Sequence, residues 1–180
     1  DFVNRDSDPT DDQGHGTIGA GVVAGVLNNG VGMAGIGKHT KIMALKFLPA
    51  LGGGATADAA EAILYAANNG AHGVNLSFGG NTDIRTLKTA IDYAYNAGLV
   101  LFAAAGNDSL DATRCYPANY RNVITVGASD PLDRLTDFSN FGVRIDVVAP
   151  GGSSGGSGPG DEAEDLLAQG VTLLGGVDLL

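Results

Sequence analysis

Helical patterns alternate with short apolar runs along the middle of the chain, and this alternation constrains the fold most strongly. Asp58 and Glu61 form an Asp-x-x-Glu capping box that predicts the start of a helix, and Gly70 predicts its end. The apolar face of this helix recurs at helical spacing and comprises Ala60, Ile63, Leu64 and Ala67. A short strand is predicted over Val74–Leu76.

The same alternation continues toward residue 148. A second helix is predicted over Asp83–Asn96, and its apolar face comprises Leu87, Ala90, Ile91 and Ala94. Leu99–Ala104 is a continuous apolar run, which is typical of a strand buried on both faces. The remaining elements expected are a small-residue helix from Thr17 to about Val26 and strands over Lys41–Phe47, Val123–Val126 and Ile145–Val148. This order predicts an α/β fold with a mostly parallel sheet flanked by helices.

The expected sheet locates a candidate site. Ligand sites of parallel sheets form at the carboxyl ends of the strands. Asn75–Gly80 and Ala105–Asn107 follow two predicted strands directly, so we expect both segments at that edge.

His15 is the strongest candidate for a catalytic side chain. It lies between Gly14 and Gly16, after an acidic loop and at the start of the first predicted helix. The glycines permit a sharp turn and a close approach of a substrate to the ring. Such a position suits a general base, although an isolated Gly-His-Gly is more often an ordinary loop or capping histidine.

Composition limits the classes of partner. The 180 residues suffice for one domain with a sizeable core, and 44% of them are hydrophobic. The formal net charge of −10 argues against nucleic acid and anionic membrane surfaces as partners. The sequence contains no apolar run of about 18 residues, so no transmembrane helix is predicted. Cys115 is the single cysteine and excludes an internal disulfide.

Seven motifs in order give the chain a family resemblance. They are Asp-x-Gly-His-Gly-Thr at 12–17, Asn75–Gly80, Ala103–Asn107, Tyr116–Ala118, Val126–Ala128, Phe138–Asn140 and Val148–Gly151. Their order and spacing resemble those of the subtilisin-like serine proteases, the subtilases, over residues 1–151. The resemblance implies the three-layer subtilisin-like fold, which is incomplete in these residues, and a serine endopeptidase activity that proceeds through an acyl-enzyme.

The resemblance also implies roles for two residues. His15 would be the general base that takes the proton of the nucleophilic serine and later returns it to the leaving amine. Asn107 would donate a hydrogen bond to the oxyanion. The alternative for Asn107 is an asparagine that tolerates a left-handed turn after Gly106.

An extended peptide or protein substrate is the partner that the resemblance implies. The strand around Ser77, Phe78 and Gly79 resembles the one that pairs with substrate backbone, with Phe78 in a hydrophobic subsite; the alternative is a core strand. Ala104, Ala105 and Gly106 would form the opposite wall of the specificity pocket. Cys115 falls where the family usually has a glycine at the base of this pocket, which implies a shallower pocket; the alternative is a small buried thiol without effect on specificity.

Two loops are candidates for structural calcium, whereas the chemistry itself requires no cofactor. Asp1, Asn4, Asp6, Asp8 and Thr10 offer oxygens at nearly alternating positions, as hard cations require, and this spacing resembles a thermitase-like calcium loop. Asn29, with neighbouring carbonyls, resembles the family's other common calcium loop. The alternative for both is a solvated polar loop.

The chain departs from the family pattern at two triad members. No aspartate has the Asp-Ser/Thr-Gly setting of the first family strand, and no Gly-Thr-Ser-x-Ala motif is present. We therefore expect the 180 residues alone to be inactive and poorly folded unless fragments carrying the missing Asp and Ser complement them. The two hypotheses are a piece of an active, secreted protease and a non-catalytic scaffold that binds peptides.

The C-terminal part of the sequence has a different character. Residues 152–160 form a Gly/Ser-rich loop or linker, and residues 161–180 predict a short helix over Asp161–Gln169 followed by an apolar segment. This part matches no family motif and is either a natural insertion or an engineered linker and tail.

Overall fold

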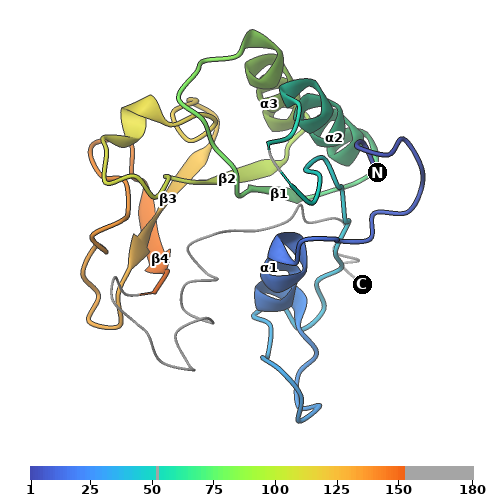
Figure 1. The fold of residues 1–180 in the computed structure, drawn as a ribbon, viewed down its shortest axis with the longest axis horizontal. Helices are drawn as coiled ribbons and strands as arrows, with labels where there is room; N and C mark the ends of the chain where they lie inside the picture. Colours follow the sequence, from blue (N-terminus) through green and yellow to red (C-terminus); the bar gives the residue numbers. More distant parts are fainter. Residues whose placement is uncertain (52, 153–180) are drawn as a thin grey trace.

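A computed structural model describes residues 1–51 and 53–152 (Figure 1). Four strands, β1 (Gly73–Leu76), β2 (Val100–Ala104), β3 (Ile124–Ser129) and β4 (Val147–Pro150), form one sheet in the order β1-β2-β3-β4. All three pairings are parallel. The expected α/β fold with a parallel sheet is thereby confirmed.

Two helices form the core against the sheet. Helix α2 (Thr56–Asn68) and helix α3 (Arg85–Asn96) lie side by side along one side of it, whereas α1 (His15–Ala24) lies apart from this pair (Figure 1). The largest fully buried apolar side chains come from α2, α3 and the first two strands; they are Ile63, Ile91, Val74, Leu76 and Leu101. Burying such side chains stabilises the fold by about 2 kcal/mol each.

The helix predictions are confirmed in position, but the capping box is wrong. Helix α1 begins at His15, two residues before the predicted start. Helix α2 begins at Thr56 after Ala55, which has no side chain that can cap it. Asp58 therefore lies inside the first turn, and its carboxylate and that of Glu61 bind the Arg5 guanidinium instead.

Two strand predictions need correction. β2 alternates between buried and more exposed residues, because only the face toward α2 and α3 is covered, and Val100 is 46% exposed. Lys41–Phe47 forms no strand among the described residues; apart from a bridge position at Ile42 it lacks ladder pairing. A strand requires a paired neighbour, and β1, at the edge of the sheet, pairs with β2 and not with this segment.

The remaining predictions differ mainly in their boundaries. The strand predicted over Ile145–Val148 is β4, which lies two residues further along and is exposed throughout. The helix predicted over Asp161–Gln169 and the segment after it lie outside the described residues. Within the described part, the longest helix, α2, is too short to cross a bilayer, and no other helix is long and apolar enough.

Candidate active site

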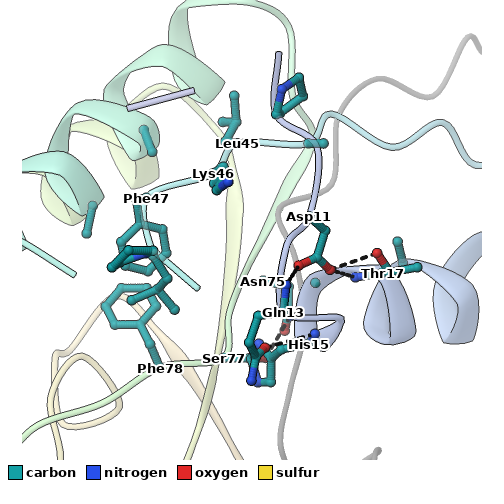
Figure 2. A pocket seen from close by; sticks show the side chains of 18 of the residues that line it. Asp11, Gln13, His15, Thr17, Leu45, Lys46, Phe47, Asn75, Ser77 and Phe78 are labelled. Atoms are coloured by element: carbon teal, nitrogen blue, oxygen red, sulfur yellow. Dashed lines mark hydrogen bonds between the residues drawn. The ribbon is translucent and has the colours of Figure 1, made fainter. Parts of the chain in front are cut away.

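His15 is the first residue of helix α1. Gly14 precedes it as the N-cap with a φ of 97°, a left-handed conformation that glycine adopts without strain. The His15 backbone N–H donates to Gln13 Oε1 at 3.0 Å. The side chain is half-buried and lines a cavity of about 720 Å³ (Figure 2).

Asp11 organises the loop that presents His15. Its Oδ1 accepts from the Gln13 and Gly14 N–H groups at 3.0 and 2.8 Å. Its Oδ2 accepts from the Thr17 N–H at 2.8 Å and from Thr17 Oγ1 at 2.7 Å (Figure 2). We call this arrangement the Asp11 clamp. It satisfies amides at the start of α1 that have no partner within the helix.

The protonation states of both residues follow from these surroundings. Partial burial acts to raise the pKa of Asp11, but hydrogen bonds from Gln13, Gly14 and Thr17 outweigh it and hold the pKa far below its ordinary value. Burial lowers the pKa of His15, and the negative charge of Asp11 partly opposes this shift. At neutral pH the imidazole is therefore predominantly neutral, as a proton acceptor must be.

The large cavity connects His15 with the end of β1. Val74 and Leu76 of β1 are buried in the core, so the strand's alternation places Asn75 and Ser77 on the other face. Asn75 and Ser77 line the cavity together with His15, and Asn75 Nδ2 donates to Ser77 Oγ at 2.8 Å. Phe78 also lines it, and its ring packs edge-on against Phe47 with centroids 4.7 Å apart.

The segment that follows β2 contains Asn107. Gly106 has a φ of 103°, so the chain turns sharply there, and Asn107 is exposed. A second cavity of about 120 Å³ lies at this edge of the sheet. Five predicted site residues line it, namely Ser77, Ala104, Ala105, Gly106 and Asn107. Because Asn75 and Ser77 line both cavities, the cavity that His15 lines and the cavity that Asn107 lines meet at the end of the same strand.

Cys115 lies between the two predicted walls of the specificity pocket. A Cβ placed on Gly79 would lie 2.9 Å from Cys115 Sγ, and one on Gly106 would lie 3.3 Å from it. Reciprocal backbone hydrogen bonds of 2.9 and 2.8 Å between Gly80 and Tyr116 hold the segment that follows β1 against the segment that contains Cys115. The thiol is buried, and this burial, followed by the charge of Asp108, raises its pKa.

The predicted calcium ligands Asp1, Asp6 and Asp8 accept hydrogen bonds from groups of their own loop. Asp1 Oδ1 accepts from the Val3 and Asn4 N–H groups, and Asp6 Oδ1 accepts from the Asp8 N–H. Asp8 Oδ1 accepts from the N–H and the hydroxyl of Thr10. In the second loop, Asn29 Oδ1 accepts from the Val31 N–H. Among residues 1–51 and 53–152, no three acidic, histidine or cysteine side chains gather so that they could hold a metal ion. Calcium binding stays a prediction.

The sequence patterns assign no role to Asp11 and Asn75, which the structure places in this site. Asp11 lies three residues before the N-cap, Gly14, whereas the known capping signal concerns the N-cap residue itself, so that signal does not find Asp11. The position of Asn75 on the cavity side of β1 follows from strand alternation once the buried face of β1 is known.

Comparisons with known proteins identify the family of this chain. The family model of the subtilase family matches residues 1–175. A thermophilic serine proteinase of Bacillus sp. (strain AK1) is 49% identical over 151 residues, which cover 84% of this chain and 37% of that protein. Thermitase of Thermoactinomyces vulgaris is 43% identical over 151 residues, covering 84% of this chain and 54% of thermitase. The chain belongs to the subtilase family.

The solved structures support the same fold. The S41 psychrophilic protease superimposes with a TM-score of 0.73 at 31% identity, over 79% of this chain and 54% of that one. A cold adapted subtilisin-like serine proteinase gives a TM-score of 0.69 at 29% identity, over 84% of this chain and 54% of that one. The chain thus has the subtilisin-like α/β fold and spans about half the length of these relatives, or less.

Proposed function

We propose that this chain is part of a serine endopeptidase in which His15 is the general base and Asn107 the oxyanion donor. The observation that carries the proposal is that His15 and Asn107 line two cavities that meet at one strand end, where Asn75 and Ser77 line both. The neutral imidazole suits the proton transfer. Membership of the subtilase family supports the reaction type.

The proposed reaction has two halves. A serine hydroxyl attacks the scissile carbonyl carbon, its proton passes to the imidazole of His15, and the oxyanion accepts a hydrogen bond from the Asn107 carboxamide. The C–N bond then breaks as His15 gives the proton to the leaving amine. Water attacks the resulting acyl ester with His15 again as base, which releases the acid and restores the serine.

We propose that the triad Asp and Ser come from other parts of the polypeptide, because neither family motif is present in the 180 residues. The edge of β1 supports an added strand. Among the described residues β1 pairs only with β2, so its outer edge is open. The cavity of about 720 Å³ adjoins this edge, and its walls include Ala59, Ala62 and Ile63 of α2. An extended apolar segment would pair with the edge and cover the core.

We further propose that the substrate is an extended peptide that lies along Ser77–Gly79 and places one side chain between Gly79 and Gly106. The proximity of Cys115 Sγ to both glycines supports a pocket made shallow by the thiol. A Cys115→Gly variant is expected to accept larger aromatic residues in peptide libraries. An unchanged preference would leave Cys115 as a buried thiol without a part in specificity.

Extracellular location and structural calcium also belong to the proposal. The secreted location is supported by a cell wall-associated protease of Bacillus subtilis (strain 168), which is 42% identical over 150 residues, 83% of this chain and 17% of that protein. Culture medium and cell fractions probed with an antibody would test it.

A fluorophosphonate probe tests the activity directly. We expect the full polypeptide to label on a serine outside residues 1–180, and the His15→Ala variant to label far more slowly. His39 is exposed and lines neither cavity, so His39→Ala is the matched control. A full polypeptide that folds, binds peptides and never labels would instead be a non-catalytic scaffold.

A further inference from the structure

Asn140 is a buried polar residue of the loop between β3 and β4. Its side chain belongs to the Phe138–Asn140 motif and is only 2% exposed. A buried carboxamide without partners is strongly destabilising, so its hydrogen bonds define its role.

Among the described residues, the Asn140 side chain hydrogen-bonds to the segment that contains Asn107. Oδ1 accepts from the Asp108 N–H at 3.1 Å and from the Leu110 N–H at 2.9 Å. Nδ2 donates to the Ala105 carbonyl at 2.8 Å. The Asn140 backbone N–H donates to the Gly106 carbonyl, also at 2.8 Å. We call this set of contacts the Asn140 clamp; it holds the chain on both sides of Asn107.

The clamp is itself anchored to the sheet. Ser139 Oγ donates to the Asn140 carbonyl at 2.9 Å and accepts from the Ala128 N–H of β3 at 3.1 Å. Gly106 is required for the close approach, because a Cβ at that position would lie 2.3 Å from Asn140 Nδ2. The segment after β2 is therefore fixed to β3 through a side chain and not through the strand ladder alone.

We propose that Asn140 is a positioning residue for the oxyanion donor: it holds the backbone of Asn107 so that the Asn107 carboxamide is preorganised. This inference rests on the proposed function. Preorganisation matters because a donor aimed at the developing oxyanion acts fully only when it needs no rearrangement during the reaction. Asn140 touches neither substrate nor reacting atoms and acts only through the loop.

A double-mutant cycle in the full polypeptide separates positioning from a general structural effect. Asn140→Ala is expected to lower kcat by about tenfold to a hundredfold with little change in KM, since displacements of about 1 Å have such effects. In the Asn107→Ala background the same substitution is expected to change kcat less than about twofold, because the donor it positions is absent. Effects that simply multiply would overturn the proposal.

Two further variants provide a milder substitution of Asn140 and a control at a distant asparagine. Asn140→Asp has nearly the same shape but loses the donor to the Ala105 carbonyl, so it is expected to show the same coupling to Asn107 if Asn140→Ala fails to fold. Asn122→Ala is the matched control, because Asn122 Nδ2 donates to Asp92 Oδ1 on α3, away from the segment after β2. It is expected to leave kcat unchanged.

A measurement that does not depend on catalysis tests the role of Asn140 separately from the proposed peptidase activity. Hydrogen exchange at the Asp108 and Leu110 amides and 15N relaxation at Asn107 report the clamp in the folded full polypeptide, whether it labels with fluorophosphonate or not. We expect both Asn140 variants to expose these amides to faster exchange and to increase the motion of Asn107, unlike Asn122→Ala. Unchanged exchange and relaxation would overturn the clamp even in an active enzyme.

Discussion

The two loops that present His15 and Asn107 are held in opposite ways. The Asp11 clamp uses a charged carboxylate that is partly exposed, and its most distant partner, Thr17, lies six residues away. The Asn140 clamp uses a neutral carboxamide that is 2% exposed, and 32 residues separate it from Asp108. Water can solvate the first, whereas the second must satisfy every polar atom within the protein. In this pair, the local clamp carries a charge that water can reach, whereas the buried, long-range clamp is neutral.

Alanine at the two turn glycines provides the sharpest test of this contrast. Gly106 and Gly14 both have positive φ, but a Cβ on Gly106 would meet Asn140 Nδ2, whereas one on Gly14 has nothing within 4 Å. Gly106→Ala is expected to destabilise the full polypeptide by more than about 3 kcal/mol, from strain and overpacking together. Gly14→Ala is expected to cost about 1 kcal/mol, from strain alone. Equal losses in urea unfolding would contradict the contrast.

The Asp11 clamp should reveal its charge in the pH dependence of stability. The pKa of Asp11 is lowered on folding from an ordinary value of 3.8, so its contribution is present above that pH and is lost as the pH falls toward the folded pKa. We expect Asp11→Asn to lower the free energy of unfolding by about 1 kcal/mol at pH 7, as loss of a helix cap does. The difference in the free energy of unfolding between the wild-type protein and Asp11→Asn should become smaller below about pH 4.

The control for this pH dependence is Asp12→Asn. Asp12 accepts from Lys46 Nζ at 2.7 Å, whereas the Gln13, Gly14 and Thr17 amides donate to Asp11. The Asp12 carboxylate is exposed to water, and partly exposed pairs of this kind contribute about 0.5 kcal/mol. A deficit of Asp11→Asn that stayed constant from neutral to acid pH would contradict the carboxylate clamp.

The titration of His15 gives a smaller effect. Because the charge of Asp11 raises the pKa of His15 against the effect of burial, Asp11→Asn should lower the His15 pKa further. The imidazole protons followed by NMR measure this shift, and Asn140→Asp should leave it almost unchanged. An increase in the His15 pKa of the Asp11→Asn variant would contradict the assignment.

Calcium provides the smallest expected effect and concerns the loop that leads into the Asp11 clamp. If Asp1, Asp6 and Asp8 bind calcium, millimolar CaCl2 should raise the Tm of the full polypeptide by about 3 °C for each kcal/mol of binding free energy. An equal concentration of MgCl2 is the control. No difference between the two salts, together with no heat of binding, would leave these residues as a hydrogen-bonded polar loop.

The sequence predicted the elements that depend on neighbouring residues. The apolar face of α3 is buried as expected, with Leu87, Ala90, Ile91 and Ala94 all inside. Helix spacing alone produces such a face, so no knowledge of distant residues is needed. The capping box at Asp58 was wrong because a distant residue, Arg5, competes for the same carboxylates.

The strand over Lys41–Phe47 shows the corresponding limit for sheets. Its composition suits a strand, yet pairing depends on a neighbour that may lie anywhere in the sequence, and no such ladder forms among the described residues. In the same way, the exposure of Val100 depends on what covers the other face of β2.

The sequence by itself determined the family motifs, the two amphipathic helices and the turn glycines at Gly14 and Gly106, because backbone sterics and helical spacing are local properties. The Asp11 clamp is equally local, with partners two to six residues away, but its carboxylate stands three residues before the N-cap and only the structure assigned it this role. Only the tertiary structure decided that Asn75 and Ser77 line both cavities, that Cys115 lies beneath two glycines and that Asn140 holds the segment around Asn107. These contacts join residues from different strands and loops, and burial of the shared core brings them together.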